Sequence, residues 1–340
     1  MVASLRLSRP LSLLSRTTRC NNITTSLPHF AALSLSTSHN KHSFPPARTT
    51  SYSTRTPNDH ILTLSCPDRP GIVHAVTGLL AQHSLNILES QQFSDPSSST
   101  FFMRVHFGQG LAGNLDTPTL STAFNDLGAS LQMDLALRPV AQKPKVLILV
   151  SKQLHCLADL LFRARSGQLG VDIPLIVSNH NDAAGLAQSY GIPFHHLPVT
   201  ASSKQAQEQK VLELAEAAGV DLVVLARYMQ VLSPTLTEAM SGRIINIHHS
   251  FLPSFKGAKP YHQAYDRGVK LIGATAHFVT EGLDEGPIIE QRVVRVDHGM
   301  SPRELTQEGS NVEVQVLAAA IKLVAERRVL INQNKTVVFS

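Results

Sequence analysis

Residues 143–152 read KPKVLILVSK, and the apolar run between the lysines predicts a strand that is buried on both faces of a sheet. Four further strands are predicted at IPLIVSN, FHHLPV, DLVVLAR and RIINIHH. Helical stretches such as HCLADLLFRARSGQL and KQAQEQKVLELAEAAG separate the strands. This alternation predicts an α/β domain with a doubly wound, mostly parallel sheet, which we place at residues 145–335.

A polar cluster stands at the end of the last of these strands. Residues 243–257 read RIINIHHSFLPSFKG, so that Asn246, His248 and His249 follow directly on buried apolar positions. Open parallel sheets bind their ligands beyond the carboxyl ends of the strands. The cluster is therefore a candidate site.

An acidic residue follows in a glycine-rich turn. The stretch GATAHFVTEGLDEGPIIEQ at residues 273–291 predicts two strands joined by a turn that holds Asp284. Aspartate is favoured in turns for its local hydrogen bonds. Taken alone, Asp284 is better explained as a turn residue than as a site residue.

The segment at residues 58–140 has another pattern. From His60 it predicts a strand, an amphipathic helix and two strands around a Ser-rich loop, followed by a second helix and a strand. The order βαββαβ is ferredoxin-like. The proline-containing stretch RPVAQKP then marks the boundary, with a linker at residues 141–144.

The first turn of this domain, CPDRPG, resembles that of the ACT family of small regulatory domains. The resemblance implies an amino-acid effector near Asp68 and Gly71, and a homo-oligomer, because ACT domains commonly pair edge to edge. The alternative is that the turn serves helix initiation alone, with Asp68 as a cap and Pro70 in the first turn. The turn itself leaves both readings open.

The basic surplus of the chain lies in its leading segment. Residues 1–58 contain seven Lys or Arg, twenty Ser or Thr and no Asp or Glu, although the whole chain carries a formal charge of +5. Without them, 23 basic face 25 acidic residues, so that nothing in the charge favours a nucleic-acid partner. No apolar run approaches the roughly 18 to 20 residues of a membrane span, so that we expect no membrane partner.

The same composition is typical of an organelle transit peptide, which we place at residues 1–57. The early arginines favour the mitochondrial matrix over a plastid, and a disordered cytosolic tail is the alternative. Cys20 would leave with this segment, whereas Cys66 and Cys156 have neither metal spacing nor a disulfide pattern and are expected to be core thiols.

The turn after the first strand of the larger domain carries no glycine. It reads KQLHCLADL, whereas a dinucleotide-binding turn needs several glycines for the approach of a pyrophosphate. A nicotinamide cofactor is therefore not expected. A phosphorylated substrate is not expected at this turn either, because it offers no exposed main-chain amides of that kind.

Two motifs together resemble the formyltransferase-type folate enzymes. These are N-I-H-x-S-x-L-P-S-F-x-G and, about 25 residues later, A-H-F-V-T-x-x-L-D-x-G-P, within a likeness that covers residues 145 to about 296. The resemblance implies a catalytic set of Asn246, His248 and Asp284. An amide and an imidazolium can stabilise the oxyanion formed on a formamide carbonyl, while a carboxylate accepts a proton or holds the histidine charged, so that no metal is expected.

Two further histidines are candidates for supporting roles. His249 stands where formyl-transferring relatives usually have proline, and it either packs behind the site or helps to place water. His277 likewise has two possible roles: it either makes hydrogen bonds in the core or supports the site.

The resemblance also implies a pterin pocket. We expect it to involve the following residues, of which the first three are otherwise ordinary core candidates: Met229, Val231, Leu232, Thr280, Gly282 and Leu283. The folate would be the substrate, and no cofactor is expected.

The choice between water and an amine as the acceptor of the formyl group follows from a motif that the sequence lacks. A transformylase acting on glycinamide ribonucleotide has a glycine-rich first turn for the substrate phosphate, which is absent here. Together with the ACT-like domain, this resembles folate enzymes that give the formyl group to water, releasing formate and tetrahydrofolate in the one-carbon metabolism that serves purine synthesis and photorespiration. The alternatives are transfer to an amine and a non-catalytic amino-acid sensor. Two departures from these relatives are Lys256 and the stretch Gly309-Ser310-Asn311 in the last helix.

Overall fold

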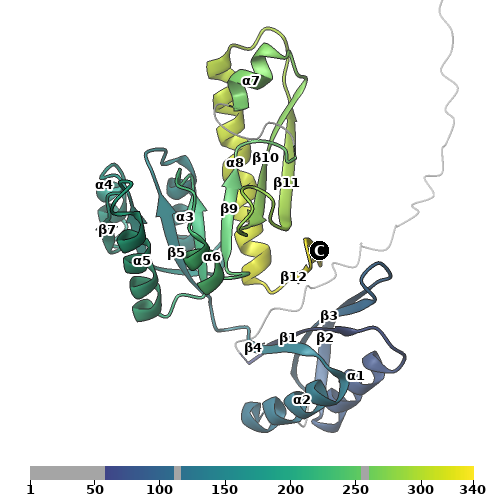
Figure 1. Cartoon of the computed structure of the whole chain (residues 1–340). Coiled ribbons are helices and arrows are strands. Elements are labelled where there is room, and N and C mark those ends of the chain that lie inside the picture. Colours follow the sequence, from purple (N-terminus) through teal and green to yellow (C-terminus); the bar gives the residue numbers. More distant parts are fainter. Residues whose placement is uncertain (1–57, 111–115, 254–259) are drawn as a thin grey trace, which may run out of the picture. The chain divides into compact units, whose positions relative to one another are not determined.

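The computed structural model of the protein describes residues 58–110, 116–253 and 260–340 (Figure 1). The predicted transit peptide, with Cys20, and the departure at Lys256 lie outside the described residues. None of the helices in the described ranges has the length and apolar character needed to cross a membrane.

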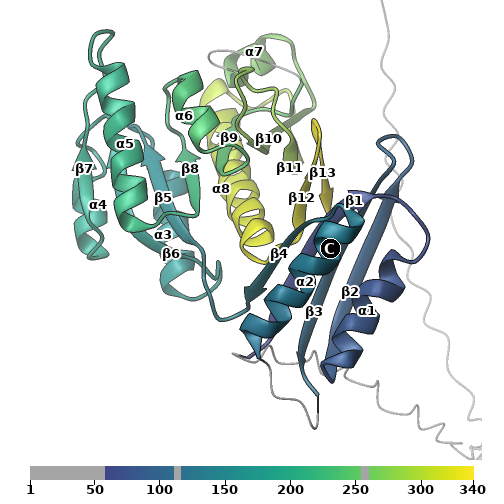
Figure 2. The same cartoon turned by 60° about the horizontal axis from the view of Figure 1, so that its bottom comes forward.

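The amino-terminal half has the βαββαβ order that its sequence predicts. Its elements are β1 (His60–Pro67), α1 (Ile72–Gln82), β2 (Leu85–Asp95), β3 (Thr100–Gln109), α2 (Thr117–Leu131) and β4 (Asp134–Pro139). The four strands form an antiparallel sheet in the order β2-β3-β1-β4. Both helices lie on one face of this sheet (Figure 2), and the ferredoxin-like class is confirmed.

Alternate residues of β1 build the core of this half. Leu62, Leu64 and Cys66 point to the helix-covered face, where they meet Val76 and Leu80 of α1. Side chains on one face recur every second residue in a strand and roughly every 3.6 residues in a helix. The apolar side chains of β1 and α1 therefore face one another.

The start of α1 differs from the expected cap. Gly71, with φ of 93°, is the residue before the helix, and no side chain caps it. Asp68 instead accepts a hydrogen bond from the hydroxyl of Ser94, and its main-chain NH donates to the carbonyl of Ser99 at 2.9 Å. The prediction that Asp68 caps the helix and that Pro70 lies in its first turn was wrong, because the left-handed Gly71 turns the chain before the helix begins.

The carboxy-terminal half alternates strands and helices. Its elements are β5 (Lys145–Val150), α3 (His155–Arg165), β6 (Asp172–Ser178), α4 (Ala184–Ser189), β7 (Phe194–His196), α5 (Lys204–Ala218), β8 (Leu222–Ala226), α6 (Pro234–Ala239), β9 (Ile244–His248), α7 (Pro260–Asp266), β10 (Leu271–Phe278), β11 (Ile288–Arg295), α8 (Pro302–Ala325), β12 (Val329–Asn332) and β13 (Lys335–Val338). The last two strands form a separate antiparallel hairpin.

Seven strands form one sheet in the order β11-β10-β9-β8-β5-β6-β7. The strands β5 to β9 are parallel, whereas β10 and β11 are antiparallel to their neighbours. The chain proceeds from β5 toward β7 on one side and returns to β8 on the other, so that the strand order reverses between β5 and β8. Ligand sites of such sheets lie beyond the strand ends near this reversal.

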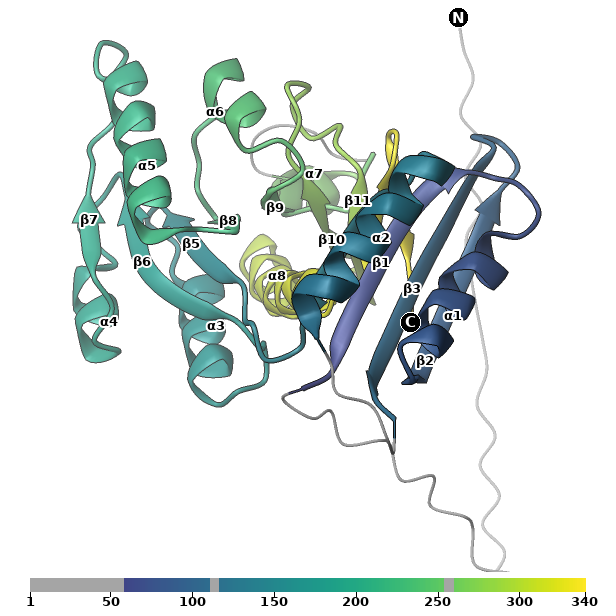
Figure 3. The ribbon, with the colours of Figure 1, turned by 90° about the horizontal axis from the view of Figure 1, so that it is seen from below.

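Two hydrophobic cores cover the two faces of the sheet. Val146, Ile148 and Val150 belong to the core beneath α3 and α8, whereas Leu147 and Leu149 belong to the core beneath α5 and α6. Figure 3 shows α3 and α5 on opposite sides of β5 and β6. A strand that must be apolar on both faces explains the uninterrupted run from which the fold was predicted.

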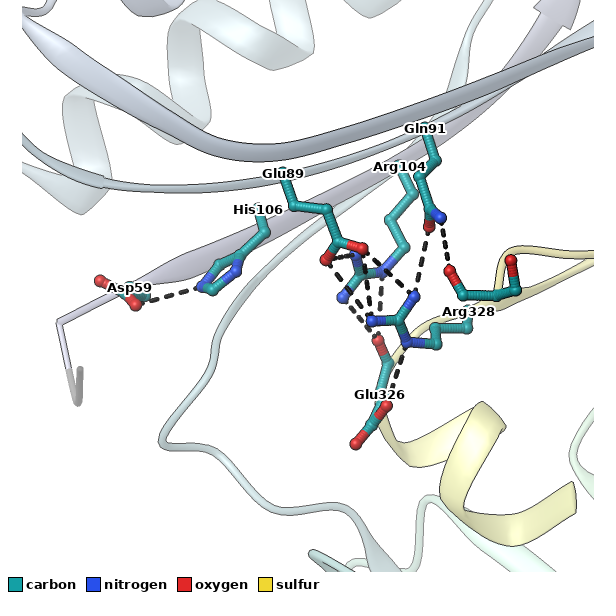
Figure 4. A network of polar contacts seen from close by, with 8 residues as sticks. Asp59, Glu89, Gln91, Arg104, His106, Glu326 and Arg328 are labelled. Atoms are coloured by element: carbon teal, nitrogen blue, oxygen red, sulfur yellow. Dashed lines mark hydrogen bonds and ion pairs between the residues drawn. The ribbon is translucent and has the colours of Figure 1, made fainter. Parts of the chain in front are cut away.

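Charged side chains from β2, β3 and the segment after α8 form a polar network (Figure 4). The fully buried Arg104 donates from Nη1 to Glu89 at 2.9 Å and from Nε and Nη2 to the carbonyl of Glu326 at 3.3 and 3.2 Å. Arg328 donates to Glu89 and to Gln91, each at 3.3 Å. Burial by itself would raise the pKa of Glu89, but the two guanidinium groups outweigh it and lower the pKa. The buried cation thus has the partners that burial of a charge requires.

Candidate active site

Three segments enclose a cavity of about 270 Å³ beyond the carboxyl ends of β8 and β9. They are the loop at 227–232 after β8, the end of β9 at 246–249 and the turn at 279–284 after β10, and His277 of β10 lines the cavity between them. The polar cluster and the glycine-rich turn of the sequence therefore meet at one site.

Strand β9 places two polar side chains on one face. Ile245 and Ile247 belong to the core beneath α3 and α8, so that Asn246 and His248 point to the other face. The antiparallel register opposes Asn246 to His277 of β10. The alternation that buries the isoleucines also brings the amide and the imidazole into the cavity.

The side chains of His248 and Asp284 form a buried contact. Nδ1 of His248 lies 3.2 Å from Oδ2 of Asp284, and the side chains are 5% and 11% exposed. Asp284 adopts a left-handed conformation with φ of 57°, which aspartate tolerates better than most residues. Burial by itself would raise the pKa of Asp284, but the hydrogen bond from His248, with the neighbouring His277 as a further cause, holds it well below its ordinary value. The carboxylate is thus ionised at neutral pH.

His277 holds the amide of Asn246. Nδ1 of His277 lies 2.8 Å from the carbonyl of Phe278, to which it can only donate, and Nε2 lies 3.2 Å from Nδ2 of Asn246. In the neutral ring, Nε2 accepts one hydrogen of the Asn246 amide. The second hydrogen of that amide remains for a ligand in the cavity, which gives His277 the geometry of a supporting residue.

The other nitrogen of the His248 ring is buried, and the residue lines the cavity. Its Nδ1 is engaged by Asp284, and within the described part of the chain its buried Nε2 has no hydrogen-bond partner. A buried polar atom without a partner is rare in folded proteins. The amide of Asn246 thus provides one donor for a carbonyl oxygen, and Nε2 of His248 provides a second when the imidazole is protonated.

His249 packs between the site and the helix α7. Its ring lies 5.2 Å from that of His248 and 6.2 Å from that of Tyr261, measured between centroids. Burial, with Arg227 and His248 as further causes, lowers the pKa of His249 to about 4. The ring is therefore neutral at physiological pH, and it both packs against Tyr261 and lines the cavity.

The rim of the cavity is apolar and exposed. Met229 and Val231 are each 57% exposed and Leu283 is 61% exposed, which is unusual for such large apolar side chains. All the residues predicted for the pterin pocket line this cavity, namely Met229, Val231, Leu232, Thr280, Gly282 and Leu283. Their assignment to folate binding stays a prediction, and the rim offers the flat apolar surface that an aromatic ring requires.

Sequence reasoning did not find a second polar cluster behind the site. Glu313 of α8, which is 1% exposed, accepts hydrogen bonds from the Tyr261 hydroxyl at 2.6 Å and from Nε2 of His155 at 2.8 Å. Nε of Arg227 lies 3.5 Å from the same carboxylate and donates to Gln153 at 2.8 Å. Arg227, directly after the buried strand of DLVVLAR, was the available signal, because a charge seldom follows such a run without a partner.

One group in this cluster has a spacing suited to a cation. The ligand atoms of His155, Cys156 and Glu313 lie within 4.8 Å of one another. Burial raises the pKa of the Cys156 thiol, which therefore stays protonated, and Glu313 already accepts two hydrogen bonds. These donors fit a hydrogen-bonded cluster better than a metal centre.

The predicted effector positions, Asp68 and Gly71, are not among the residues that line this cavity. Gly71 precedes α1, and a Cβ added to it would meet no atom within 4 Å. Space for a ligand thus exists at this turn, whereas the carboxylate of Asp68 is engaged by Ser94. The effector site stays a prediction.

Comparison with known proteins places both halves in families. The formyl transferase model matches residues 144–321, and the ACT domain model matches residues 60–114. The chain thus combines an ACT domain with a formyl transferase domain, and the cavity of the latter holds Asn246, His248 and Asp284.

Individual relatives define the family more narrowly. Formyltetrahydrofolate deformylase of Corynebacterium sp. (strain P-1) is 51% identical over 279 residues, which cover 82% of this chain and 97% of the relative. The crystal structure of formyltetrahydrofolate deformylase from Burkholderia mallei ATCC 23344 is 53% identical, with a TM-score of 0.81, over 84% of this chain and 100% of that one. The chain belongs to the formyltetrahydrofolate deformylase family.

A transferase is similar over a smaller part of the chain. The crystal structure of glycinamide ribonucleotide transformylase 1 from Symbiobacterium toebii is 35% identical, with a TM-score of 0.56, over 58% of this chain and 95% of that one. The likeness to the deformylases thus extends over more of this chain, which disfavours the amine-transfer alternative.

Proposed function

We propose that this protein hydrolyses 10-formyltetrahydrofolate to tetrahydrofolate and formate. One observation carries the proposal: a single cavity joins two hydrogen-bond donors and an ionised carboxylate to an exposed apolar rim. The rim suits a pterin ring, and the donors suit a formyl oxygen. The folate is consumed as substrate, and the site requires no further cofactor.

The proposed reaction assigns each polar group a task. The amide of Asn246 and Nε2–H of a protonated His248 donate to the formyl oxygen and stabilise the negative charge that develops on it. Asp284 orients His248 through Nδ1 and accepts a proton from the attacking water. The C–N10 bond then breaks, and the proton passes to N10.

Product identification tests this function against transfer. The protein is incubated with 10-formyltetrahydrofolate labelled in the formyl group, with and without glycinamide ribonucleotide. Labelled formate in equal amounts under both conditions supports hydrolysis. A labelled formyl amide, or no consumption of the folate, would contradict the proposal.

We also propose that residues 1–57 direct the protein to the mitochondrial matrix, where it adjusts the one-carbon pool that purine synthesis and photorespiration draw on. The Arg- and Ser-rich, acid-free composition supports this. A fusion of residues 1–57 to a fluorescent protein tests the address. Mitochondrial fluorescence is expected, and plastid or diffuse fluorescence would contradict it.

A further inference from the structure

Arg227 has an unusual position beside the catalytic cavity. It is 7% exposed, lines the cavity together with His248 and follows β8 with a φ of 62°. Left-handed conformations of residues other than glycine are uncommon and gather at functional sites. The carbonyl of Arg227 accepts from Ser151 N at 3.3 Å, and the Ser151 hydroxyl accepts from Met229 N at 3.0 Å, which holds this conformation in place.

Only part of the guanidinium is engaged. Nε donates to Gln153 at 2.8 Å and lies 3.5 Å from Glu313. Nη1 is buried and, within the residues that the structure describes, has no hydrogen-bond partner. A buried donor without a partner costs roughly 1 to 3 kcal/mol, so that its retention calls for an explanation.

Two buried nitrogen atoms without a partner thus belong to residues that line one cavity. Nη1 of Arg227 and Nε2 of His248 are the buried side-chain atoms of the described ranges without a partner, and both residues line the site. Arg227 also contributes to the low pKa of His249, which places its charge near the two imidazoles. Donors gathered in this way fit a small anionic group with two oxygens.

We propose that Arg227 binds the oxygen of the attacking water and retains it as one oxygen of the product formate, while His248 and Asn246 hold the other. The proposal rests on the hydrolytic function above. The water oxygen bonds to the formyl carbon, and the C–N10 bond breaks. One water proton passes through Asp284 to N10, and the other leaves with formic acid, which ionises to formate. The guanidinium donates to the water-derived oxygen throughout and stabilises its negative charge once formic acid ionises.

The competing explanation is that Arg227 only neutralises the buried Glu313. The two are separated by measuring kcat, KM and inhibition by formate in the full-length protein. The variants are Arg227→Met, Glu313→Gln and the double variant, with Arg227→Lys retaining the charge without the planar fork. Thermal unfolding of each reports whether it folds.

We expect Arg227→Met to lower kcat roughly 10²- to 10³-fold, the scale for loss of one oxyanion donor, with a much smaller change in KM for the folate. Formate inhibition of Arg227→Met should be at least tenfold weaker than that of the wild type. The kcat and the formate inhibition of Arg227→Lys should lie between those of the wild type and Arg227→Met. Adding Glu313→Gln to Arg227→Met should not restore kcat or formate inhibition. Recovery in the double variant to the rate of Glu313→Gln alone would overturn the proposal. So would formate inhibition of equal strength in wild type and Arg227→Met.

If Arg227→Met does not fold, Arg227→Lys and the double variant decide the matter by the same two readouts. Failure of the proposed hydrolytic function can be distinguished from failure of the proposed role of Arg227. Wild-type protein that releases no formate contradicts the hydrolytic function, whereas wild-type protein that releases formate while Arg227→Met matches it contradicts only the role of Arg227.

Discussion

At the scale of single residues, the site depends on the charge of Asp284. Its carboxylate lies 3.2 Å from Nδ1 of His248 and 3.7 Å from Nε2 of His277, and its pKa is held below the ordinary value, so that it can accept a proton only transiently. This environment suits a group that orients a neighbouring imidazole and relays the proton of water.

Replacement of Asp284 tests this role. We expect Asp284→Asn to retain folate binding, because the apolar rim is unchanged, and to lose hydrolysis by roughly 10²- to 10⁴-fold, the scale for a lost acid or base. Formate release gives the rate, and quenching of protein or folate fluorescence gives the binding. Glu285→Gln, in the same turn, is the matched control and should keep most of the activity. Wild-type turnover of Asp284→Asn would remove the residue from the mechanism.

His249 gives the stability a pH dependence with a defined sign. Burial lowers its pKa to about 4, against an ordinary value of 6.5, so that between these values the unfolded chain binds the proton and the folded protein does not. Stability is therefore full above pH 6.5 and falls as the pH drops toward 4, by roughly 2 kcal/mol at pH 5 from this residue. Midpoints of urea unfolding at pH 7.5 and pH 5 should thus differ less in His249→Gln than in wild type. An identical pH dependence of both proteins would show that His249 is not buried in its neutral form.

At the scale of elements, the last helix carries a residue that the site needs to be small. A Cβ added to Gly309 of α8 would lie 2.1 Å from Cζ of Tyr261, whose hydroxyl donates to Glu313 on the next turn of the same helix. Within the stretch Gly309-Ser310-Asn311, it is therefore Gly309 that lies close to Tyr261. Ser310 meets no such restriction, because its hydroxyl donates to the carbonyl of Thr306 at 2.9 Å.

This contact reverses the usual effect of glycine in a helix. On an exposed helix Gly→Ala stabilises by roughly 0.5 to 1 kcal/mol. Gly309→Ala should instead destabilise by roughly 1 to 3 kcal/mol, because the methyl group displaces Tyr261 in a packed core. Ser310→Ala is the control and should change the free energy of unfolding by less than about 0.5 kcal/mol. Denaturant titration of both variants decides the matter, and a stabilised Gly309→Ala would show that Tyr261 can move aside at little cost.

The elements also show what sequence could predict. Strands such as β5 and β8 were predictable because burial on both faces demands an uninterrupted apolar run. The meeting of Asn246 with Asp284 was predictable from two motifs and the rule for strand ends. The pairing of Arg227 with Glu313 could not be predicted. The two residues are 86 positions apart, on a loop and on a helix, and no sequence pattern links them. The cap of α1 was mispredicted because the left-handed Gly71, rather than a side chain, sets where the helix begins.

At the scale of the whole molecule, the chain joins a hydrolase to a domain of the ACT family, and a hydrolase that empties a folate pool without restraint is wasteful. An effector alters catalysis only if it binds two states of the protein with different affinity. Typical couplings of roughly 1 to 3 kcal/mol would change folate affinity about 5- to 150-fold. The open turn at Gly71 gives such an effector a place next to the main chain.

The last prediction concerns this turn. Gly71→Val places a branched side chain where φ is 93° and where an effector's main-chain groups would lie, so that it should abolish regulation and cost roughly 1 to 3 kcal/mol of local strain. Gly78→Ala is the matched control, because Gly78 lies within α1, where an added Cβ also meets nothing within 4 Å, and it should leave regulation intact. Glycine, methionine and other small amino acids are titrated against formate release by wild type and both variants. We expect an amino acid to change formate release by wild type and Gly78→Ala but not by Gly71→Val. The basal activity of Gly71→Val should be unchanged. If no amino acid alters wild-type activity, the domain serves assembly instead, and sedimentation of Gly71→Val beside wild type then shows whether this turn contributes to it.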